Sequence, residues 1–278
     1  MSLINILVTL NQNYLMPLKT ALTSLAANNR AYEFHIYLLH KTITPAQIQE
    51  LSTFVQSFNW HFTAIQIDQV FDTQKITTIH DYPSEMYFRL LAGDFLPDDV
   101  SRIIYLDPDT LIINDLSPLW TFDLGDAMMA AASHTGLLDA VTPINNLRLN
   151  TEGKYYNTGV LLMDLNKTRQ IIQASAIQQT IETYHDQLLL PDQDVLNHLY
   201  HSHIVEIPEE IWNYDTRQFM TYQIRSMGEH TLAWVMQQTV ILHFAGSPKP
   251  WEAKSDSRFT ALYLQYQQLT NRHIAQLN

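Results

Sequence analysis

Two aspartates stand one residue apart directly after an apolar run. Residues Ile103 to Leu106 are all apolar or aromatic, and Asp107, Pro108 and Asp109 follow them. Such a run is typical of a strand buried on both faces, and Pro108 ends it because proline cannot donate to a sheet. The carboxylates then project from the carboxyl end of the strand, which is the edge where open α/β sheets bind ligands.

Two interpretations of this pair are open. Carboxylates this close repel each other unless a positive charge lies between them, and hard divalent cations prefer oxygen ligands. The pair therefore favours a metal site. Asp-Pro-Asp is also ordinary turn composition, so a solvated turn explains the same residues.

A histidine and a lysine follow a second apolar run near the C-terminus. Val240 to Leu242 precede His243, and Gly246 and Lys249 lie in the proline-rich loop after it. A neutral imidazole at a strand end can complete a site with two carboxylates, and a lysine held by a stiff loop is a point cation suited to a diphosphate. Taken singly, a capping histidine and a surface lysine are the alternative.

Polar side chains also mark the ends of two other predicted elements. Asn157 and Thr158 lead into the apolar run 160–163, where an amide could bond sugar hydroxyls, although an asparagine turn is a simpler alternative. Asp192 and Gln193 open a predicted helix. Asp192 is predicted to be its N-cap, because acidic side chains are favoured at that end of the helix dipole.

The composition narrows the classes of function. The chain has 278 residues, 46% of them hydrophobic and 16% charged, which is typical of a globular protein with a sizeable core. A formal net charge of −12 argues against a nucleic-acid partner, and the absence of cysteine excludes disulfides and thiolate chemistry. The 7 glycines form no GxGxxG or P-loop pattern, so a metal and cationic side chains would have to neutralise a bound nucleotide.

The N-terminal sequence and the hydropathy predict a cytoplasmic protein. Residues 1–5 lack the positive region of a signal peptide, so this stretch is predicted to begin the first strand. No segment approaches the roughly 18 apolar residues of a membrane-spanning helix. The C-terminal part lacks a strongly basic amphipathic helix that would dock on anionic lipid, but peripheral membrane contact is left open.

The elements that would position these residues alternate between strands and helices. Strands are predicted over 4–9, 34–39, 61–68, 103–106, 111–113, 128–133, 160–163, 204–207 and 239–243. Helices are predicted over 17–28, 44–57, 84–91, 165–184, 192–200 and 258–277, and 139–154 is predicted to be a long loop. The βαβαβ opening implies a parallel sheet, and the absence of a linker favours one α/β domain.

Four motifs, taken together and in this order, resemble glycosyltransferase family 8. They are Tyr-Leu-Asp-x-Asp from Tyr105, Asn-x-Gly-Val-Leu-Leu from Asn157, Asp-Gln-Asp from Asp192, and His-x-x-Gly-x-x-Lys-Pro-Trp from His243. The resemblance extends from Ile4 to about Trp251. It implies a GT-A fold, which is Rossmann-like with a mixed, mostly parallel sheet, over residues 1–254, and a helical extension packed on it over 255–278.

The resemblance also implies a UDP-hexose donor, Mn²⁺ and transfer with retention at the anomeric carbon. The expected metal ligands are Asp107, Asp109 and His243. The residues expected to bind the nucleotide, with Tyr14 against uracil and the last two on the diphosphate, are Thr9, Asn11, Asn13, Tyr14, Arg89, Gly246 and Lys249. The residues expected around the donor sugar are Asn157, Asp192 and Gln193.

The expected mechanism is a front-face attack. Lys249 would stabilise the leaving diphosphate together with the metal. Gln193 has no ionisable group and is a poor nucleophile, so a double displacement through a covalent intermediate is disfavoured.

Two residues depart from the family pattern and leave the substrate open. Asn11 stands where relatives often have aspartate, although its amide oxygen should still accept from the uracil N–H. His134 stands where bacterial galactosyltransferases have an aspartate near the sugar, so galactose and glucose both remain candidates, as do glycan and glycoconjugate acceptors. The alternative functions are a UDP-sugar hydrolase and a non-catalytic UDP-sugar-binding paralogue.

Overall fold

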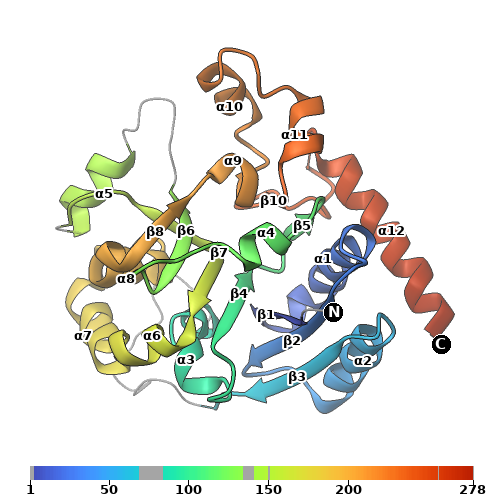
Figure 1. The fold of residues 1–278 in the computed structure, drawn as a ribbon, viewed down its shortest axis with the longest axis horizontal. Coiled ribbons are helices and arrows are strands. Elements are labelled where there is room, and N and C mark those ends of the chain that lie inside the picture. Colours follow the sequence, from blue (N-terminus) through green and yellow to red (C-terminus); the bar gives the residue numbers. More distant parts are fainter. Residues whose placement is uncertain (1–2, 69–83, 134–140, 150, 256, 278) are drawn as a thin grey trace.

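A seven-stranded sheet forms the centre of the protein (Figure 1). The computed structural model describes residues 3–68, 84–133, 141–149, 151–255 and 257–277. The strand order of the sheet is β3-β2-β1-β4-β7-β6-β8. Its strands are β1 (Leu3–Thr9), β2 (Glu33–His40), β3 (His61–Gln66), β4 (Arg102–Leu106), β6 (Met129–Ser133), β7 (Tyr156–Asp164) and β8 (Ile204–Ile207).

Six of these strands run in one direction and β7 runs against them. β1 is parallel to β2 and β4, β2 to β3, and β6 to β8, whereas β7 pairs antiparallel with β4 and β6. The mixed, mostly parallel sheet expected from the sequence is therefore confirmed. Because β7 is reversed, its amino end lies at the same edge as the carboxyl end of β4, and the Asp107 N–H donates to the Gly159 carbonyl (2.8 Å).

A second, three-stranded sheet lies beside this edge. It contains β5 (Thr110–Ile112), β10 (Ile241–His243) and β9 (Tyr214–Asp215), in the order β5-β10-β9. The strand predicted over 111–113 forms here as β5 and does not extend the central sheet. Pro108 ends the ladder of β4, and the chain turns, with the Thr110 hydroxyl donating to the Asp107 carbonyl (2.8 Å). The antiparallel pairing of Thr110 with His243 then brings the two distant motifs together.

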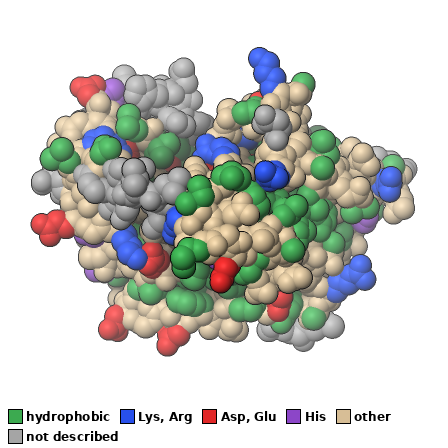
Figure 2. Space-filling model, turned by 90° about the horizontal axis from the view of Figure 1, so that it is seen from above, with side chains coloured by type: hydrophobic (Ala, Val, Ile, Leu, Met, Phe, Trp, Pro, Cys, Tyr) green, Lys and Arg blue, Asp and Glu red, His purple; other side chains and the backbone are tan. Residues whose placement is uncertain are grey.

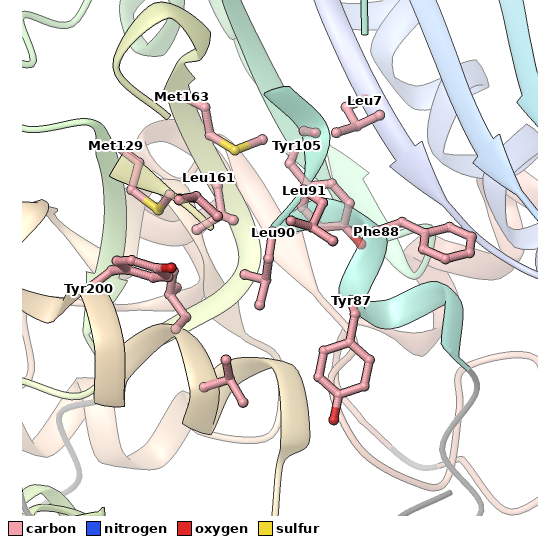
Figure 3. Close-up of a cluster of buried hydrophobic side chains, with 14 of the residues drawn as sticks. Leu7, Tyr87, Phe88, Leu90, Leu91, Tyr105, Met129, Leu161, Met163 and Tyr200 are labelled. Carbon is pink, nitrogen blue, oxygen red and sulfur yellow. The ribbon is translucent and has the colours of Figure 1, made fainter. Parts of the chain in front are cut away.

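Helices cover both faces of the central sheet (Figure 1). The side chains of β4 alternate between two cores. Ile104 and Leu106 belong to the core under α1 (Leu15–Asn28) and α2 (Pro45–Gln56). Ile103 and Tyr105 belong to the other core, part of which Figure 3 shows, under α6 (Leu165–Ile171), α7 (Ala174–Tyr184) and α8 (Pro191–Tyr200). The helices are α1 (Leu15–Asn28), α2 (Pro45–Gln56), α3 (Ala92–Phe95), α4 (Ser117–Trp120), α5 (Val141–Leu149), α6 (Leu165–Ile171), α7 (Ala174–Tyr184), α8 (Pro191–Tyr200), α9 (Glu209–Trp212), α10 (Phe219–Arg225), α11 (Leu232–Gln238) and α12 (Thr260–Leu277). Short 3₁₀ helices are η1 (Gln12–Tyr14), η3 (Ser84–Arg89) and η4 (His201–His203).

Three predictions of helix or loop differ from the structure. Residues 84–91, predicted as a helix, form only the shorter 3₁₀ helix η3. Residues 165–184 form two helices because Ile172 and Gln173 adopt extended backbone angles, and the Ile172 side chain is buried in the core. Residues 141–149, predicted as loop, form α5. Its Arg148 pairs with Asp194 of α8, and this long-range contact outweighs the polar, loop-like local sequence.

The C-terminal helix α12 packs along α1 (Figure 1). The hydroxyl of Thr270 donates to that of Thr23 (2.8 Å), and the Asn28 amide donates to the Tyr266 hydroxyl (2.9 Å). The same Asn28 amide donates to the carbonyl of Ile112 in β5 (3.0 Å). The helix therefore supports the second sheet, while the division of the chain after residue 254 stays a prediction.

The end of the molecule formed by α10 and α11 carries exposed apolar side chains. Figure 2 looks onto this end and shows hydrophobic and basic side chains close together, with acidic ones mainly toward the edges of the view. The exposed apolar residues here are Met220, Ile224, Met227, Leu232 and Met236.

Asp194 ties the start of α8 to its surroundings. Its Oδ1 accepts from the Tyr155 hydroxyl (2.5 Å) and from Arg148 (2.7 Å). Its Oδ2 accepts from Arg148 (2.7 Å) and from the backbone N–H groups of Leu189 (2.7 Å) and Leu190 (3.0 Å). One fully buried carboxylate thus fixes both α5 and the loop before α8.

We expect Asp194→Ala to lower the free energy of unfolding by about 3–5 kcal/mol, because it leaves Arg148 and two backbone N–H groups without their acceptor. Urea unfolding of the purified variant measures the change. Asp186→Ala is the control, since that side chain is 99% exposed, and it should stay within about 0.5 kcal/mol of the wild type. Equal stability of both variants would contradict the structural role of Asp194.

Candidate active site

Asp107, Asp109 and His243 converge where the two sheets meet. Asp107 follows β4, Asp109 precedes β5 and His243 ends β10. One ligand atom from each of the three lies within 4.8 Å of those from the others. The Nε2 atom of His243 is 3.7 Å from Oδ2 of Asp107 and 3.4 Å from Oδ1 of Asp109. Within the described ranges, no other His, Cys, Asp or Glu group of three or more has this geometry.

Asp107 is oriented by its neighbours. Its Oδ1 accepts from the Tyr105 hydroxyl (2.6 Å) and pairs with Arg89 (2.9 Å). The Tyr105 hydroxyl in turn lies 3.2 Å from the hydroxyl of Thr9. With Oδ1 held in this way, Oδ2 faces His243. Two carboxylate oxygens and an imidazole nitrogen, aimed at one point, suit a divalent cation such as Mn²⁺.

Lys249 and His243 compensate the charge of Asp109. The Lys249 ammonium bonds the Asp109 carboxylate and the Phe244 carbonyl (3.0 Å). Burial alone would raise the pKa of Asp109, but His243 and Lys249 outweigh it and hold that pKa below its ordinary value. Burial would lower the pKa of His243, but Asp109 outweighs it and raises that pKa. Asp109 therefore stays ionised and can attract a cation.

Arg89 braces the two acidic groups of the site. It pairs with Asp107 and, through Nε, with Asp192 (3.3 Å), and its guanidinium stacks on the Tyr105 ring at 4.4 Å. It also donates to the Thr158 carbonyl (3.1 Å). Because Arg89 is buried, its positive charge interacts mainly with these neighbouring protein groups. Its contact with a donor substrate stays a prediction.

Asp192 and Gln193 lie at the start of α8, next to the reversed strand β7. The prediction that Asp192 is the N-cap is wrong, because the helix begins at Pro191 and Leu190 is the N-cap. The Asp192 carboxylate instead accepts from the Thr158 hydroxyl (2.9 Å). Burial raises the pKa of Asp192 by more than Arg89 lowers it.

An amide network joins Gln193 to the metal-ligand group. Asn157 donates to Oε1 of Gln193 (3.0 Å), and Asn213 donates to Oδ1 of Asn157 (2.7 Å). The Oδ1 atom of Asn213 lies 2.8 Å from Nδ1 of His243. The structure thus connects residues that the sequence places in four separate segments.

A pocket of about 340 Å³ lies beside Asp107 and Asp109. Its lining residues are Thr9, Leu10, Asn11, Tyr14, Glu85, Met86, Arg89, Asp107, Pro108 and Asp109. The Tyr14 ring packs edge-to-face on Trp251, with 6.0 Å between the centroids. Asn13 is exposed and is not among the lining residues, but its backbone N–H donates to Oδ1 of Asn11 (3.0 Å). His134 lies outside the described residues.

Sequence reasoning did not assign roles to Gly159 and Asn213. A Cβ atom on Gly159 would lie 2.4 Å from Cε1 of His243 and 2.9 Å from Oδ2 of Asp107, so only glycine lets β7 pass the ligands. The Asn-x-Gly motif contained a signal for Gly159, since glycine inside a strand often marks a close approach. Asn213 carried no such signal, because nothing in its local sequence relates it to His243.

The family described as "Glycosyl transferase family 8" matches residues 5–255. The chain belongs to glycosyltransferase family 8. General stress protein A of Bacillus subtilis is 24% identical over 266 residues, which cover 94% of this chain and 91% of that protein. The lipopolysaccharide 1,2-glucosyltransferase of Escherichia coli K12 is 24% identical over 254 residues, which cover 89% of this chain and 72% of that protein.

The solved structures agree with the family assignment. The galactosyltransferase LgtC, in complex with donor and acceptor sugar analogues, matches with a TM-score of 0.79 at 21% identity, over 96% of both chains. The expected GT-A fold is confirmed, and this family 8 protein is a glycosyltransferase. Among the described residues no helix has the length and hydrophobicity to cross a membrane. The cytoplasmic location stays a prediction.

We expect Gly159→Ala to lower the affinity for Mn²⁺ by roughly 10- to 100-fold, because the new methyl group must displace the His243 ring or the Asp107 carboxylate. Calorimetric titration with Mn²⁺ alone measures this. Gly93→Ala is the matched control, since its Cβ would meet Arg169 at 2.9 Å, far from the ligands, and should leave Mn²⁺ affinity unchanged. A Gly159→Ala variant with wild-type affinity would show that β7 does not constrain the ligands.

Proposed function

We propose that this family 8 enzyme moves galactose or glucose from a UDP-sugar to a glycan or glycoconjugate acceptor, in a Mn²⁺-dependent reaction that retains the anomeric configuration. The observation that carries the proposal is the convergence of Asp107, Asp109 and His243 beside the pocket that Tyr14 lines. A lipopolysaccharide glucosyltransferase among the relatives supports a hexose donor and a glycoconjugate acceptor.

The pocket suits a uridine. Tyr14 offers an aromatic face for the base, and Trp251 supports the ring from the side. Asn11 keeps an oxygen where relatives often have aspartate, and the residue lines the pocket. This oxygen accepts from the Asn13 backbone N–H and has a second lone pair with which it can accept from the uracil N–H. Thr9 lines the inner end beside Tyr105.

The cationic groups suit a diphosphate leaving group. Bound Mn²⁺ would supply positive charge to the diphosphate as it departs. The Lys249 ammonium adds a second positive charge from the opposite side of Asp109. Gly246, in the same loop, has a φ of 70°, a left-handed conformation that glycine adopts readily.

The residues near the donor sugar support a front-face attack. Oε1 of Gln193 already accepts from Asn157, and an amide is a weak nucleophile in any case. The Asp192 carboxylate is engaged by Thr158 and Arg89, so it suits holding a hydroxyl better than attacking a carbon. The acceptor would then lose its proton to the departing phosphate.

A screen of UDP-sugars with Mn²⁺ present, followed by UDP release, tests the proposal. UDP-galactose or UDP-glucose should give Mn²⁺-dependent release that is stimulated by glycan acceptors, and NMR should show an α-linked product. Equal release without any acceptor would favour a UDP-sugar hydrolase. Binding of UDP-sugar without release of UDP would favour a non-catalytic binding protein.

We expect Lys249→Ala to lower kcat by roughly 10²- to 10³-fold, because it removes a positioned cation from the leaving group. Affinity for Mn²⁺ in the absence of UDP should stay equal or increase, because the ammonium that shares Asp109 with the metal is gone. Steady-state kinetics and Mn²⁺ titration measure the two effects.

Lys254→Ala is the control, since that lysine is exposed in the same C-terminal stretch and should leave both quantities unchanged. A Lys249→Ala variant that turns over at the wild-type rate, or that no longer binds Mn²⁺, would contradict the assigned role.

A further inference from the structure

We infer that Asn213 is a positioning residue that holds His243 in the tautomer required of a metal ligand. This inference rests on the proposed metal site at Asp107, Asp109 and His243. Asn213 does not face the ligand atoms itself. It acts from behind the imidazole, through Nδ1, while Nε2 faces the two carboxylates.

The contact is buried and well formed. Oδ1 of Asn213 lies 2.8 Å from Nδ1 of His243, and the two residues are 2% and 5% exposed. Water therefore cannot readily replace the amide oxygen as the partner of Nδ1. An imidazole that loses this partner would keep a buried polar nitrogen without a hydrogen bond, which is costly.

A backbone N–H group determines which atoms donate and which accept in this hydrogen-bond network. The Gly159 N–H donates to the side chain of Asn157 (2.8 Å), and because a backbone N–H can only donate, the atom it meets must be oxygen. The atom of Asn213 that lies 2.7 Å from this oxygen must then be its amide nitrogen. The remaining Asn213 atom, an oxygen, faces His243.

The tautomer of His243 follows from this polarity. An amide oxygen accepts only, so Nδ1 of His243 must carry a hydrogen. In the neutral ring, Nε2 is then left with a lone pair, directed at Asp107 and Asp109. Metal-bound histidines in proteins commonly donate their second N–H to an oxygen in this way, which sets the ring orientation and increases ligand basicity.

A purely structural role for the Asn213 side chain is a weaker explanation. Asn213 is the C-cap of α9, but its backbone N–H makes the capping bond, to the Glu209 carbonyl (3.0 Å). The side chain takes no part in that cap. Its two recorded partners are Asn157 and His243, both at the candidate site.

Titration of the metal-free protein with Mn²⁺ alone tests the inference. Asn213→Ala should bind Mn²⁺ roughly 10- to 100-fold more weakly than the wild type. Asn213→Asp keeps an acceptor for the His243 N–H but loses the N–H that bonds Oδ1 of Asn157, so it should bind Mn²⁺ more tightly than Asn213→Ala, by about 3-fold or more, which is roughly 0.6 kcal/mol. Saturating Mn²⁺ should restore most of the kcat of Asn213→Ala, which it would not do for a general folding defect.

Asn29→Ala is the matched control for a buried asparagine. Asn29 is 3% exposed and its side chain accepts from Leu116 N–H (2.8 Å) and donates to the Asn114 carbonyl (3.2 Å), away from the ligands. It should lower thermal stability without changing Mn²⁺ affinity. An Asn213→Ala variant with wild-type affinity, or an Asn213→Asp variant as weak as Asn213→Ala, would overturn the inference.

Nitrogen-15 NMR of the wild-type protein gives a second test that needs no Asn213 variant. With Zn²⁺ as a diamagnetic probe, the His243 ring, identified by its loss in His243→Gln, should show a protonated Nδ1 and a metal-bound Nε2. The opposite tautomer would overturn the inference. If the wild-type protein binds no metal, the proposed metal site is wrong, and the role of Asn213 falls with it. If the wild-type protein binds Mn²⁺ and the Asn213 variants bind it equally well, only the role of Asn213 is wrong.

Discussion

Two carboxylates at a buried sheet edge repel each other, and much of the surrounding structure compensates for that repulsion. Arg89 pairs with Asp107, Lys249 pairs with Asp109, and the His243 ring faces both. Each cation comes from a different part of the chain, so the charges balance only after the whole domain has folded. The carboxylate oxygens of Asp107 and Asp109 that face His243 still favour one more positive charge, such as that of a divalent cation.

The reversed direction of β7 brings further polar residues to the same sheet edge as the two aspartates. In a fully parallel sheet, the residues at the start of a neighbouring strand would lie at the far edge, about one strand length away from the aspartates. With β7 antiparallel to β4, Asn157 and Gly159 enter the site, and α8 places Gln193 beside them. The second sheet brings His243 to the site through the antiparallel pairing of β10 with β5.

The sequence alone predicts those parts of the site that have a recognisable local sequence pattern. The apolar run before Asp107 and the one before His243 predict strand ends, and the four motifs together predict the family and its fold. The sequence alone does not predict features that depend on contacts between distant parts of the chain. The helix α5 is fixed by an ion pair across 46 residues, and β5 leaves the central sheet because it pairs with β10. The link from Asn213 to His243 spans 30 residues with no local pattern, so only the folded chain reveals it.

The ion pair between Lys249 and Asp109 has a thermodynamic consequence. One ammonium group cannot neutralise Asp109 and a diphosphate at full strength at the same time. Under the proposed function, a cation that binds Asp109 releases Lys249 to the nucleotide, and a nucleotide that draws Lys249 away leaves Asp109 more attractive to a cation. Linkage requires these two effects to be equal in free energy. A single lysine can therefore make the binding of cation and nucleotide mutually cooperative, even without direct contact between the two ligands.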